Sequence, residues 1–401
     1  MKSSSSQPQT PAVMKPLGGQ TNRDPIILVH GLAGFGREEL FGYRYWGGLY
    51  DLQESLERAG HTVYTAAIGP FSSNWDRACE LYAQIKGGTV DYGESHSASF
   101  GHKRYGRTFP GFYPQWGTLD PATGKVRKVH LVGHSMGGQT SRTLAQLLEA
   151  GAPMETNAVS PLFQGGQPGR VRSITSISTP HDGSSLVYTT NAVWPFLQQI
   201  IAAAGMMSSL TERPFYDFKL DHWGLGAQPG EPFLVYFSRI AQSSLWSQSH
   251  DTATWDLSPE GAAALNAWTK ACADVLYFSW STSATIRLPF TGQHIPSPKM
   301  SPFWIPYAYA MGIYSQPGGP DRIQIDEHWW ENDGWVNTIS MDGPKLNSSD
   351  RIVPYDGTPR PGVWNHMGQL HGFDHTDVVG IGSPYPVDGW YHRLAEFLES
   401  L

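Results

Sequence analysis

The sequence predicts an α/β protein with a mostly parallel central sheet and helices on both faces. Short apolar runs bounded by Gly or Pro recur along the chain, and stretches of helical character lie between them. Such runs are typical of strands buried on both faces, as in a parallel sheet covered by helices. Hydrophobic residues make up 40% of the 401 positions, which is enough for a sizeable core.

Taken in order, the apolar runs expected to form strands lie at 25–30, 62–68, 128–133, 171–178 and 274–280. The helical stretches lie at 139–149, 259–273 and 390–401. The second of these begins cleanly, because Ser258 can cap it and Pro259 suits the first helical position. We therefore predict a single domain from residue 24 to residue 401.

Three regions depart from this alternation. Residues 1–23 are rich in Ser, Gln and Pro and have no apolar core behind Lys2, so we expect a disordered tail rather than a signal peptide. Residues 69–127 hold few strand signals. Residues 182–260 hold a strongly apolar helix followed by polar, Trp-containing sequence. We interpret the last two regions as insertions in the α/β core.

Composition excludes two classes of partner. Lys and Arg number 28 against 35 Asp and Glu, and this net charge of −7 gives no basic footprint for nucleic acid. No apolar run approaches the ~18–20 residues of a membrane span. Cys79 and Cys272 are too few for a disulfide framework, and they are either free thiols or one bridge. The sequence indicates no oligomeric state.

The clearest chemical signal is G-H-S-M-G at 133–137, a G-x-S-x-G motif between a predicted strand and a predicted helix. In that context the glycines permit a sharp turn that exposes the Ser135 hydroxyl, and the helix N-terminus favours a developing oxyanion. The backbone N–H of Met136 is one expected oxyanion donor, and that of Leu32, after the strand at 25–30, is the other. The motif predicts Ser135 as a nucleophile for acyl transfer.

A nucleophilic serine needs a histidine base and an orienting acid, which follow it in the order acid, then His, in this type of fold. His375 lies in a late loop before the last predicted helix and is the expected base, with His366 and His371 as nearby rivals. Asp333 and Asp350 are both loop aspartates that could orient it. The residues alone do not separate these two acids.

Longer strings make a family resemblance specific. The chain resembles the thermoalkalophilic Bacillus/Geobacillus and staphylococcal lipases in G-R-E-E-L-F-G-Y-R-Y-W-G-G (36–48), G-H-S-M-G-G-Q-T (133–140), Y-D-F-K-L-D-H-W-G-L (216–225), E-N-D-G-W-V-N-T (331–338) and S-S-D-R-I-V-P-Y-D-G (348–357). The match runs from about residue 24 to residue 399. It implies an α/β-hydrolase fold and a secreted triacylglycerol lipase that acts on water-insoluble acylglycerols at a lipid–water interface.

The resemblance also chooses among the candidates. The family acid is the Asp of an N-D-G string, here Asp333, and the family base is the His of a late D-H pair, here His375. Ser135 matches the nucleophile, and Leu32 and Met136 match the oxyanion-donor positions. Enzymes of short soluble esters, polyesters or phospholipids remain alternatives, as does a zinc-dependent hydrolase.

The family carries a zinc site of two Asp and two His. The residues on the matching strings are Asp76, His96, His102 and Asp256. Without the resemblance they are weak evidence for a metal. Four such ligands leave no open position for water, so the Zn²⁺ would be structural and would tie the 69–127 insertion to a distant segment. Trp75 and Trp255 each precede a ligand and are expected to shield it.

Two further features follow from the resemblance. Calcium is often bound near the catalytic His, and Asp377 matches one acidic ligand, but the next acidic position is Gly382 here and a backbone-carbonyl position falls near Lys299. Apolar residues at helical spacing in 194–207 match a lid helix over the active site, although periodicity alone would favour a core helix. They are Trp194, Phe196, Leu197, Ile200, Ile201, Ala204 and Met207.

Overall fold

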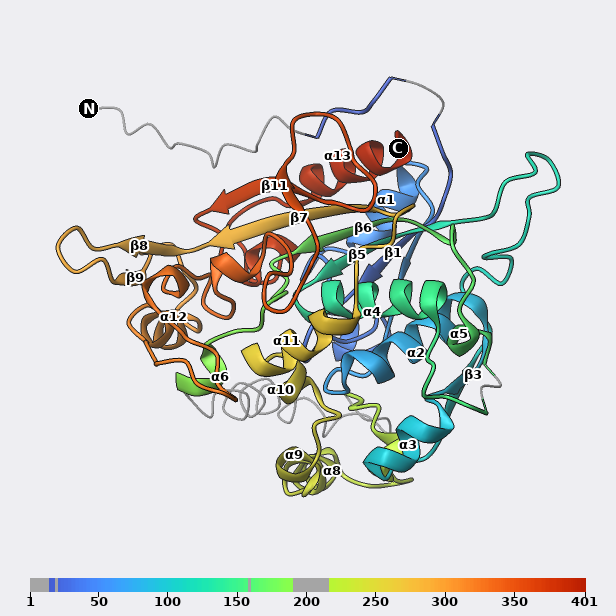
Figure 1. Cartoon of the computed structure of the whole chain (residues 1–401), viewed down its shortest axis with the longest axis horizontal. Helices are drawn as coiled ribbons and strands as arrows, with labels where there is room; N and C mark the ends of the chain where they lie inside the picture. The colour runs from blue at the N-terminus through green and yellow to red at the C-terminus, as the bar shows by residue number, and fades with distance from the viewer. Residues whose placement is uncertain (1–13, 19–20, 158–159, 190–215) are drawn as a thin grey trace.

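The computed structural model describes residues 14–18, 21–157, 160–189 and 216–401. At its centre is a seven-stranded sheet in the order β10-β11-β7-β6-β5-β1-β2, in which all neighbouring strands are parallel (Figure 1). Its strands are β1 (Ile26–Val29), β2 (Val63–Thr65), β5 (Val129–His134), β6 (Val171–Ile177), β7 (Leu276–Ser283), β10 (Ile352–Pro354) and β11 (Trp364–His371). The predicted α/β class with a mostly parallel sheet is confirmed.

Helices cover both faces of this sheet (Figure 1). On one face lie α1 (Leu52–Arg58) and α13 (Asp388–Glu399), and on the other lie α2 (Asn74–Lys86), α4 (Met136–Ala150) and α11 (Pro259–Trp268). Strand β1 shows why the strands are continuously apolar. Ile26 and Leu28 belong to the hydrophobic cluster that contains α1 and α13, and Ile27 and Val29 belong to the cluster that contains α2 and α4.

The smaller elements lie outside the sheet. The short helices are α3 (Glu94–Phe100), α5 (Pro161–Gln164), α6 (Leu186–Thr189), α8 (Phe233–Ala241), α9 (Leu245–Gln248), α10 (Ala253–Asp256) and α12 (Ile305–Met311). The 3₁₀ turns are η1 (Leu40–Gly42), η2 (Asp221–Trp223), η3 (Glu327–Trp329), η4 (Thr338–Ser340) and η5 (Asp377–Val379). Two antiparallel hairpins pair β3 (Gly88–Asp91) with β4 (Tyr105–Phe109) and β8 (Thr285–Arg287) with β9 (His294–Pro296).

The five predicted strands and three predicted helices all form, with shifted ends. Helix α4 begins at Met136, directly after Ser135, whereas the prediction began at 139. Strands β10 and β11 are absent from the prediction because β10 is only 3 residues long and the sequence of β11 is mostly polar, so neither gives a clear apolar run. The proposed base rivals His366 and His371 both lie on β11.

Parts of the regions interpreted as an insertion and as a disordered tail pack against the core of the protein. Helix α2 lies inside the 69–127 region but packs on the sheet as a core helix. The segment 194–207, taken as a lid, lies outside the described residues. From the predicted tail, Met14 is buried, and the Asn22 side-chain amide donates to the carbonyls of Leu398 and Glu399, so this part packs against the end of α13.

The structure also describes the two cysteines and the length and polarity of the helices. Cys79 and Cys272 are both buried and both free, so no bridge forms between them. No helix that the structure describes is long and apolar enough to cross a membrane.

Candidate active site and metal group

Ser135 stands at the corner between β5 and α4. Its backbone has φ 55° and ψ −132°, a conformation that L-residues rarely adopt and that is found at functional sites. The turn is held from β6, because the Ser135 N–H donates to the Ile177 carbonyl at 2.9 Å. Glycine is required after it, since a Cβ on Gly137 would lie 2.1 Å from the Val29 oxygen. The tight packing of β1 against the start of α4 therefore fixes where the hydroxyl points.

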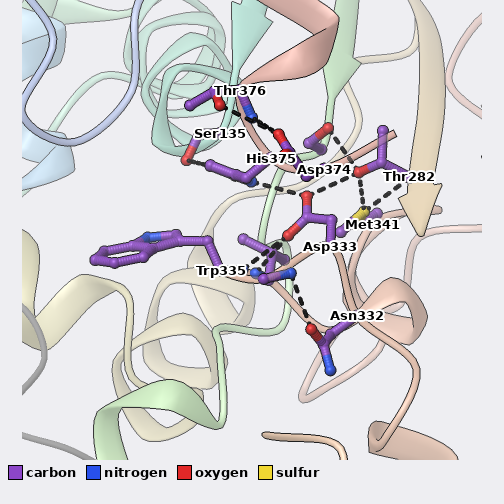
Figure 2. A network of polar contacts seen from close by, with 12 residues as sticks. Ser135, Thr282, Asn332, Asp333, Trp335, Met341, Asp374, His375 and Thr376 are labelled. Atoms are coloured by element: carbon purple, nitrogen blue, oxygen red, sulfur yellow. Dashed lines mark hydrogen bonds and ion pairs between the residues drawn. The ribbon is translucent and has the colours of Figure 1, made fainter. Parts of the chain in front are cut away.

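The structure brings Ser135, His375 and Asp333, the predicted nucleophile, base and acid, together in a hydrogen-bonded line (Figure 2). The Ser135 Oγ lies 3.0 Å from His375 Nε2, and His375 Nδ1 lies 2.8 Å from Asp333 Oδ2. These three side chains come from the strand–helix corner, a late loop and the loop before η4. The predicted base thus lies within hydrogen-bonding distance of both the predicted nucleophile and the predicted acid.

Asp333 is fully buried and its carboxylate is fixed by donors other than His375. Oδ1 accepts the N–H groups of Trp335 (3.0 Å) and Val336 (2.8 Å), and Oδ2 also accepts the Thr282 hydroxyl (2.8 Å) (Figure 2). These hydrogen bonds hold the carboxylate in a fixed position opposite His375 Nδ1. Asp350, the alternative acid, instead accepts the Ala271 N–H and the Trp364 indole N–H.

A cavity of about 440 Å³ opens onto the serine and the histidine. Its lining is mainly apolar and aromatic, and consists of Leu32, Ala33, Phe35, Leu40, Tyr43, Tyr45, His134, Ser135, Ser301, Phe303, Trp304, Trp335, His375, Thr376, Val379, Ile381 and Gly382. The backbone N–H groups of Leu32 and Met136 have no hydrogen-bond partner among the described residues. The first belongs to the loop after β1 and the second to the first turn of α4, so both are available as oxyanion donors.

A second cluster lies apart from this cavity, where α2, α3 and the segment before α10 meet. Asp76, His96, His102 and Asp251 place one ligand atom each within 4.8 Å of the others. His96 Nε2 lies 3.3 Å from Asp76 Oδ1 and 3.2 Å from Asp251 Oδ2, and His102 Nε2 lies 3.2 Å from the same Asp251 oxygen. Ligands about 2.0 Å from a tetrahedrally bound ion stand about 3.3 Å from one another, so these spacings fit one shared ion.

The unsatisfied atoms of the cluster fit a metal as well. Asp76 Oδ1 and His102 Nε2 are buried and have no hydrogen-bond partner. The other nitrogen of His102, Nδ1, lies 2.9 Å from the Lys103 carbonyl and therefore carries the proton, which leaves Nε2 with its lone pair toward the cluster. Burial lowers the pKa of His96, but the carboxylates of Asp251 and Asp76 outweigh this and raise it to about 10.

The surroundings of the cluster contain one contact that sequence reasoning missed. His222 Nε2 lies 2.9 Å from Asp76 Oδ2, and thereby orients this carboxylate so that its other oxygen faces the histidines. His222 lies in the 216–225 string that carried the resemblance, which was the only sequence signal for it. Trp75 stacks on His96 at 4.9 Å, as a shielding residue would, whereas Trp255 stacks on His250 instead.

Comparison with known proteins gives the family. The protein-family model described as "Lipase-like, C-terminal domain" matches residues 22–399. The chain belongs to this lipase-like family. It is 37% identical over 374 residues to "Lipase" of Staphylococcus epidermidis, covering 90% of this chain and 51% of that protein. It is 36% identical to "Lipase 1" of Staphylococcus aureus over 407 residues, covering 96% and 55%. The chain spans about half the length of these curated relatives.

Three solved structures share the fold over nearly the whole chain. EstA from Clostridium botulinum is 47% identical with a TM-score of 0.88, covering 98% of this chain and 90% of that one. Lipase 1 from Pelosinus fermentans is 48% identical with a TM-score of 0.86, covering 95% and 99%. The Staphylococcus hyicus lipase is 33% identical with a TM-score of 0.77, covering 96% and 97%. The resemblance and the α/β-hydrolase fold are confirmed, and the relatives other than EstA are named lipases, which are enzymes that hydrolyse carboxylic esters.

One predicted ligand of this lipase-like chain is wrong. Asp256 is not in the metal group, and Asp251 takes its place. Asp256 is the last residue of α10 and accepts the Asn74 N–H at the start of α2, which turns it away from the histidines. Both aspartates lie in H-D-T-A-T-W-D (250–256), and the sequence offers no feature that separates them.

Asp377, the predicted calcium ligand, lies beside a second aspartate in this lipase-like fold. Asp377 packs beside Asp374, whose N–H donates to Asp377 Oδ2 at 2.9 Å. Burial and the Asp374 carboxylate raise the pKa of Asp377 to about 7. Within the described ranges, Asp377 belongs to no group of three or more metal-ligating side chains. Gly382 lines the active-site cavity and offers no side-chain ligand.

Proposed function

We propose that this chain is a triacylglycerol lipase that hydrolyses esters of water-insoluble acylglycerols through an acyl-enzyme on Ser135. The observation that carries the proposal is the line of hydrogen bonds from Ser135 through His375 to Asp333, which meets a cavity lined mainly by apolar and aromatic side chains. An apolar cavity suits an acyl chain, and the family relatives named lipases support the same reading.

In the proposed mechanism each group has a defined step. Ser135 Oγ attacks the ester carbonyl carbon while His375 Nε2 takes its proton, and Asp333 holds the imidazole by Nδ1 and stabilises the imidazolium. The N–H groups of Leu32 and Met136 donate to the oxyanion. His375 then protonates the leaving alcohol, and the C–O bond of the ester breaks. A water molecule, deprotonated by His375, cleaves the acyl-enzyme and releases the fatty acid.

Replacing the nucleophile tests the proposal. Ser135→Ala should lower kcat on a soluble p-nitrophenyl ester by about 10⁴-fold or more, because no other group can form the acyl-enzyme. A fluorophosphonate probe should label the wild type at Ser135 and leave the variant unlabelled. The circular dichroism spectrum should be the same for both. Retained turnover in a correctly folded variant would remove Ser135 from the mechanism.

Substrate class is tested on the wild type. Activity on emulsified long-chain triacylglycerol should exceed activity on soluble tributyrin below its solubility limit. A higher rate on short soluble esters, on polyester films or on phospholipid vesicles would favour one of those alternatives instead. We further propose that the enzyme acts outside the cell, as the resemblance implies, which fractionation of the producing cells would test.

We also propose that the metal group binds a structural Zn²⁺. Two neutral imidazoles and two carboxylates would balance the charge of Zn²⁺ in a tetrahedral site, and the orphaned atoms Asp76 Oδ1 and His102 Nε2 face one another across it. The ion would supply cross-linking between α2, α3 and the segment before α10, because the four ligands come from these places. Four protein ligands leave no position for a reacting water, which argues against the zinc-hydrolase alternative.

Calcium at Asp377 stays a prediction. The charge of the Asp374 carboxylate acts on Asp377, and carboxylate oxygens are ligands that Ca²⁺ prefers. If the pair holds Ca²⁺, adding CaCl₂ to chelator-treated protein that has been reloaded with Zn²⁺ should raise the unfolding temperature, and Asp377→Asn should abolish this rise. An unfolding temperature independent of Ca²⁺ would end the proposal.

A further inference from the structure

Two buried side chains that have no part in the steps above connect the loops of the proposed active site. Tyr45 belongs to the 36–48 string of the resemblance, and His134 precedes the nucleophile. Both line the active-site cavity and both are buried, with 8% of Tyr45 and 1% of His134 exposed. Buried polar side chains at a site of this kind call for a full account of their donors and acceptors.

The hydrogen bonds of His134 fix its tautomer. Its Nε2 lies 2.9 Å from the His375 carbonyl oxygen, which can only accept, so this nitrogen carries the proton. Its Nδ1 lies 2.6 Å from the Tyr45 hydroxyl. Burial, reinforced by the neighbouring His375, lowers the pKa of His134 well below its usual value, so the ring is neutral and Nδ1 accepts. The Tyr45 O–H is therefore the donor in this bond.

The Tyr45 oxygen is in turn an acceptor. The Gly31 N–H donates to it at 3.0 Å. Three hydrogen bonds thus run in one direction, from Gly31 N–H to the Tyr45 oxygen, from Tyr45 O–H to His134 Nδ1, and from His134 Nε2–H to the His375 carbonyl. Every donor has one acceptor, and no proton is left to share.

The two ends of this series of three hydrogen bonds lie on the backbones of Gly31 and His375, which are both close to Ser135. Gly31 precedes Leu32, the proposed oxyanion donor, and its backbone packs on the nucleophile so closely that a Cβ there would lie 2.5 Å from the Ser135 Cβ. The other end is the backbone of His375, the proposed base. The chain of bonds therefore sets the distance between the oxyanion loop and the base loop.

We infer that Tyr45 and His134 are positioning residues, which hold the oxyanion loop and the base loop in register on either side of Ser135. This inference rests on the proposed serine-hydrolase function and deepens it. Neither side chain needs to touch the reacting atoms. Their contribution is to the alignment of groups that do, and a misplacement of about 1 Å in such a group can cost about 10²-fold in rate.

The test is Tyr45→Phe, which removes one oxygen and keeps the ring in the cavity wall. On a soluble p-nitrophenyl ester, kcat should fall by about tenfold or more while KM changes by less than about twofold, because alignment and not ground-state binding is lost. The matched control is Tyr277→Phe. The Tyr277 hydroxyl is also buried and accepts a backbone N–H, that of Cys272 at 2.9 Å, but it has no contact with the site.

Both Phe variants lose a buried hydrogen bond from a backbone N–H, and Tyr45→Phe also loses the bond to His134, so Tyr45→Phe should lose more stability than Tyr277→Phe. A purely structural role would leave kcat unchanged in both, or lower it equally in both, and either result would overturn the inference. If the wild type fails to react with a fluorophosphonate at Ser135, the proposed function itself fails. If it reacts and Tyr45→Phe keeps full kcat, the positioning inference alone is refuted.

Variants of His134 provide the test should Tyr45→Phe not fold. His134→Gln keeps one donor and one acceptor, and His134→Leu keeps neither. The Gln variant should retain at least about five times the kcat of the Leu variant at a similar unfolding temperature, because part of the alignment survives. Equal kcat in the two variants would contradict the inference. The double variant Tyr45→Phe/His134→Leu should be no slower than the slower single variant, since both break one chain of bonds.

Discussion

The proposed active site and the metal group are both clusters of buried His and Asp side chains, but their protons are arranged differently. In the active site each acceptor faces a donor, so that Asp333 receives three N–H or O–H groups besides His375. In the metal group two carboxylates and two imidazoles converge, and two of their atoms have no hydrogen-bond partner. The first cluster is complete with protein atoms alone, and in our proposal a cation completes the second.

This difference separates chemistry from stabilisation. A network whose protons are all assigned can hold a base and an acid ready for transfer, because each group has one defined role. An ion held by four protein ligands has no coordination position left for a substrate or a reacting water. We therefore expect damage to the first cluster to reduce the rate of hydrolysis, and damage to the second to reduce stability.

The largest effect is expected from the acid. Asp333→Asn keeps the size of the side chain but favours the wrong imidazole tautomer of His375, and kcat should fall by about 10⁴-fold. Steady-state kinetics on a soluble ester measure this loss. Asp350→Asn is the control, because that aspartate lies elsewhere and accepts the Ala271 and Trp364 N–H groups. Similar activity losses in both variants would mean that Asp333 is not the orienting acid.

The metal group provides the next effect. Asp251→Asn removes one charged ligand and should weaken metal binding by at least about 100-fold, equivalent to about 2.7 kcal/mol of stability when the metal is in excess. Metal content by atomic spectroscopy and the unfolding temperature measure it. Asp256→Asn is the matched control five residues away, and it should bind the metal as the wild type does.

Chelation sharpens the same contrast. With metal removed, kcat on a soluble ester at low temperature should stay within about twofold of the loaded enzyme, while the unfolding temperature falls. The zinc-hydrolase alternative predicts the opposite, an immediate loss of turnover by a protein that is still folded. Loss of metal from Asp256→Asn and not from Asp251→Asn would contradict the ligand assignment.

The extent to which the sequence predicts each cluster follows from where its residues lie. Ser135 can be found because a strand, a glycine turn and a helix surround it, and these are local signals. The choice of Asp333 over Asp350 needed the family resemblance, since both are loop aspartates and only long-range packing separates them. Asp251 and Asp256 were confused for the same reason. The docking of α10 decides which of the two aspartates points to the histidines and which points to the start of α2, and no nearby residue reveals how α10 docks.

The sheet shows the same limit. Strands β1, β5 and β6 are buried on both faces, and they can be predicted because buried strands appear in the sequence as short apolar runs. Strand β11 reads W-N-H-M-G-Q-L-H, and it is a strand because β7 and β10 pair with it on either side. His366 and His371 therefore looked like loop candidates for the base, although His366 faces Ser279 and His371 lies beside Gln369.

The smallest expected effect distinguishes Asp256 from the ligands beside it. Burial, together with the charges of Asp251 and Asp76, raises the pKa of Asp256 to about 7. The folded protein therefore keeps this proton up to about pH 7, whereas the unfolded chain loses it near pH 4. The folded state binds more protons between these values, so the contribution of Asp256 to stability is full below about pH 4 and declines as the pH rises toward 7, by up to about 4 kcal/mol.

Asp256→Asn cannot ionise in either state and should remove this decline. In the metal-free protein, the unfolding temperatures of variant and wild type, compared from pH 5 to pH 9, should diverge in favour of the variant as the pH rises and then run parallel above about pH 7. Because a bound cation offsets the charges of Asp251 and Asp76, which raise the pKa of Asp256, adding the metal should move the onset of the parallel region to lower pH. Parallel curves throughout would show that Asp256 keeps an ordinary pKa in the folded protein.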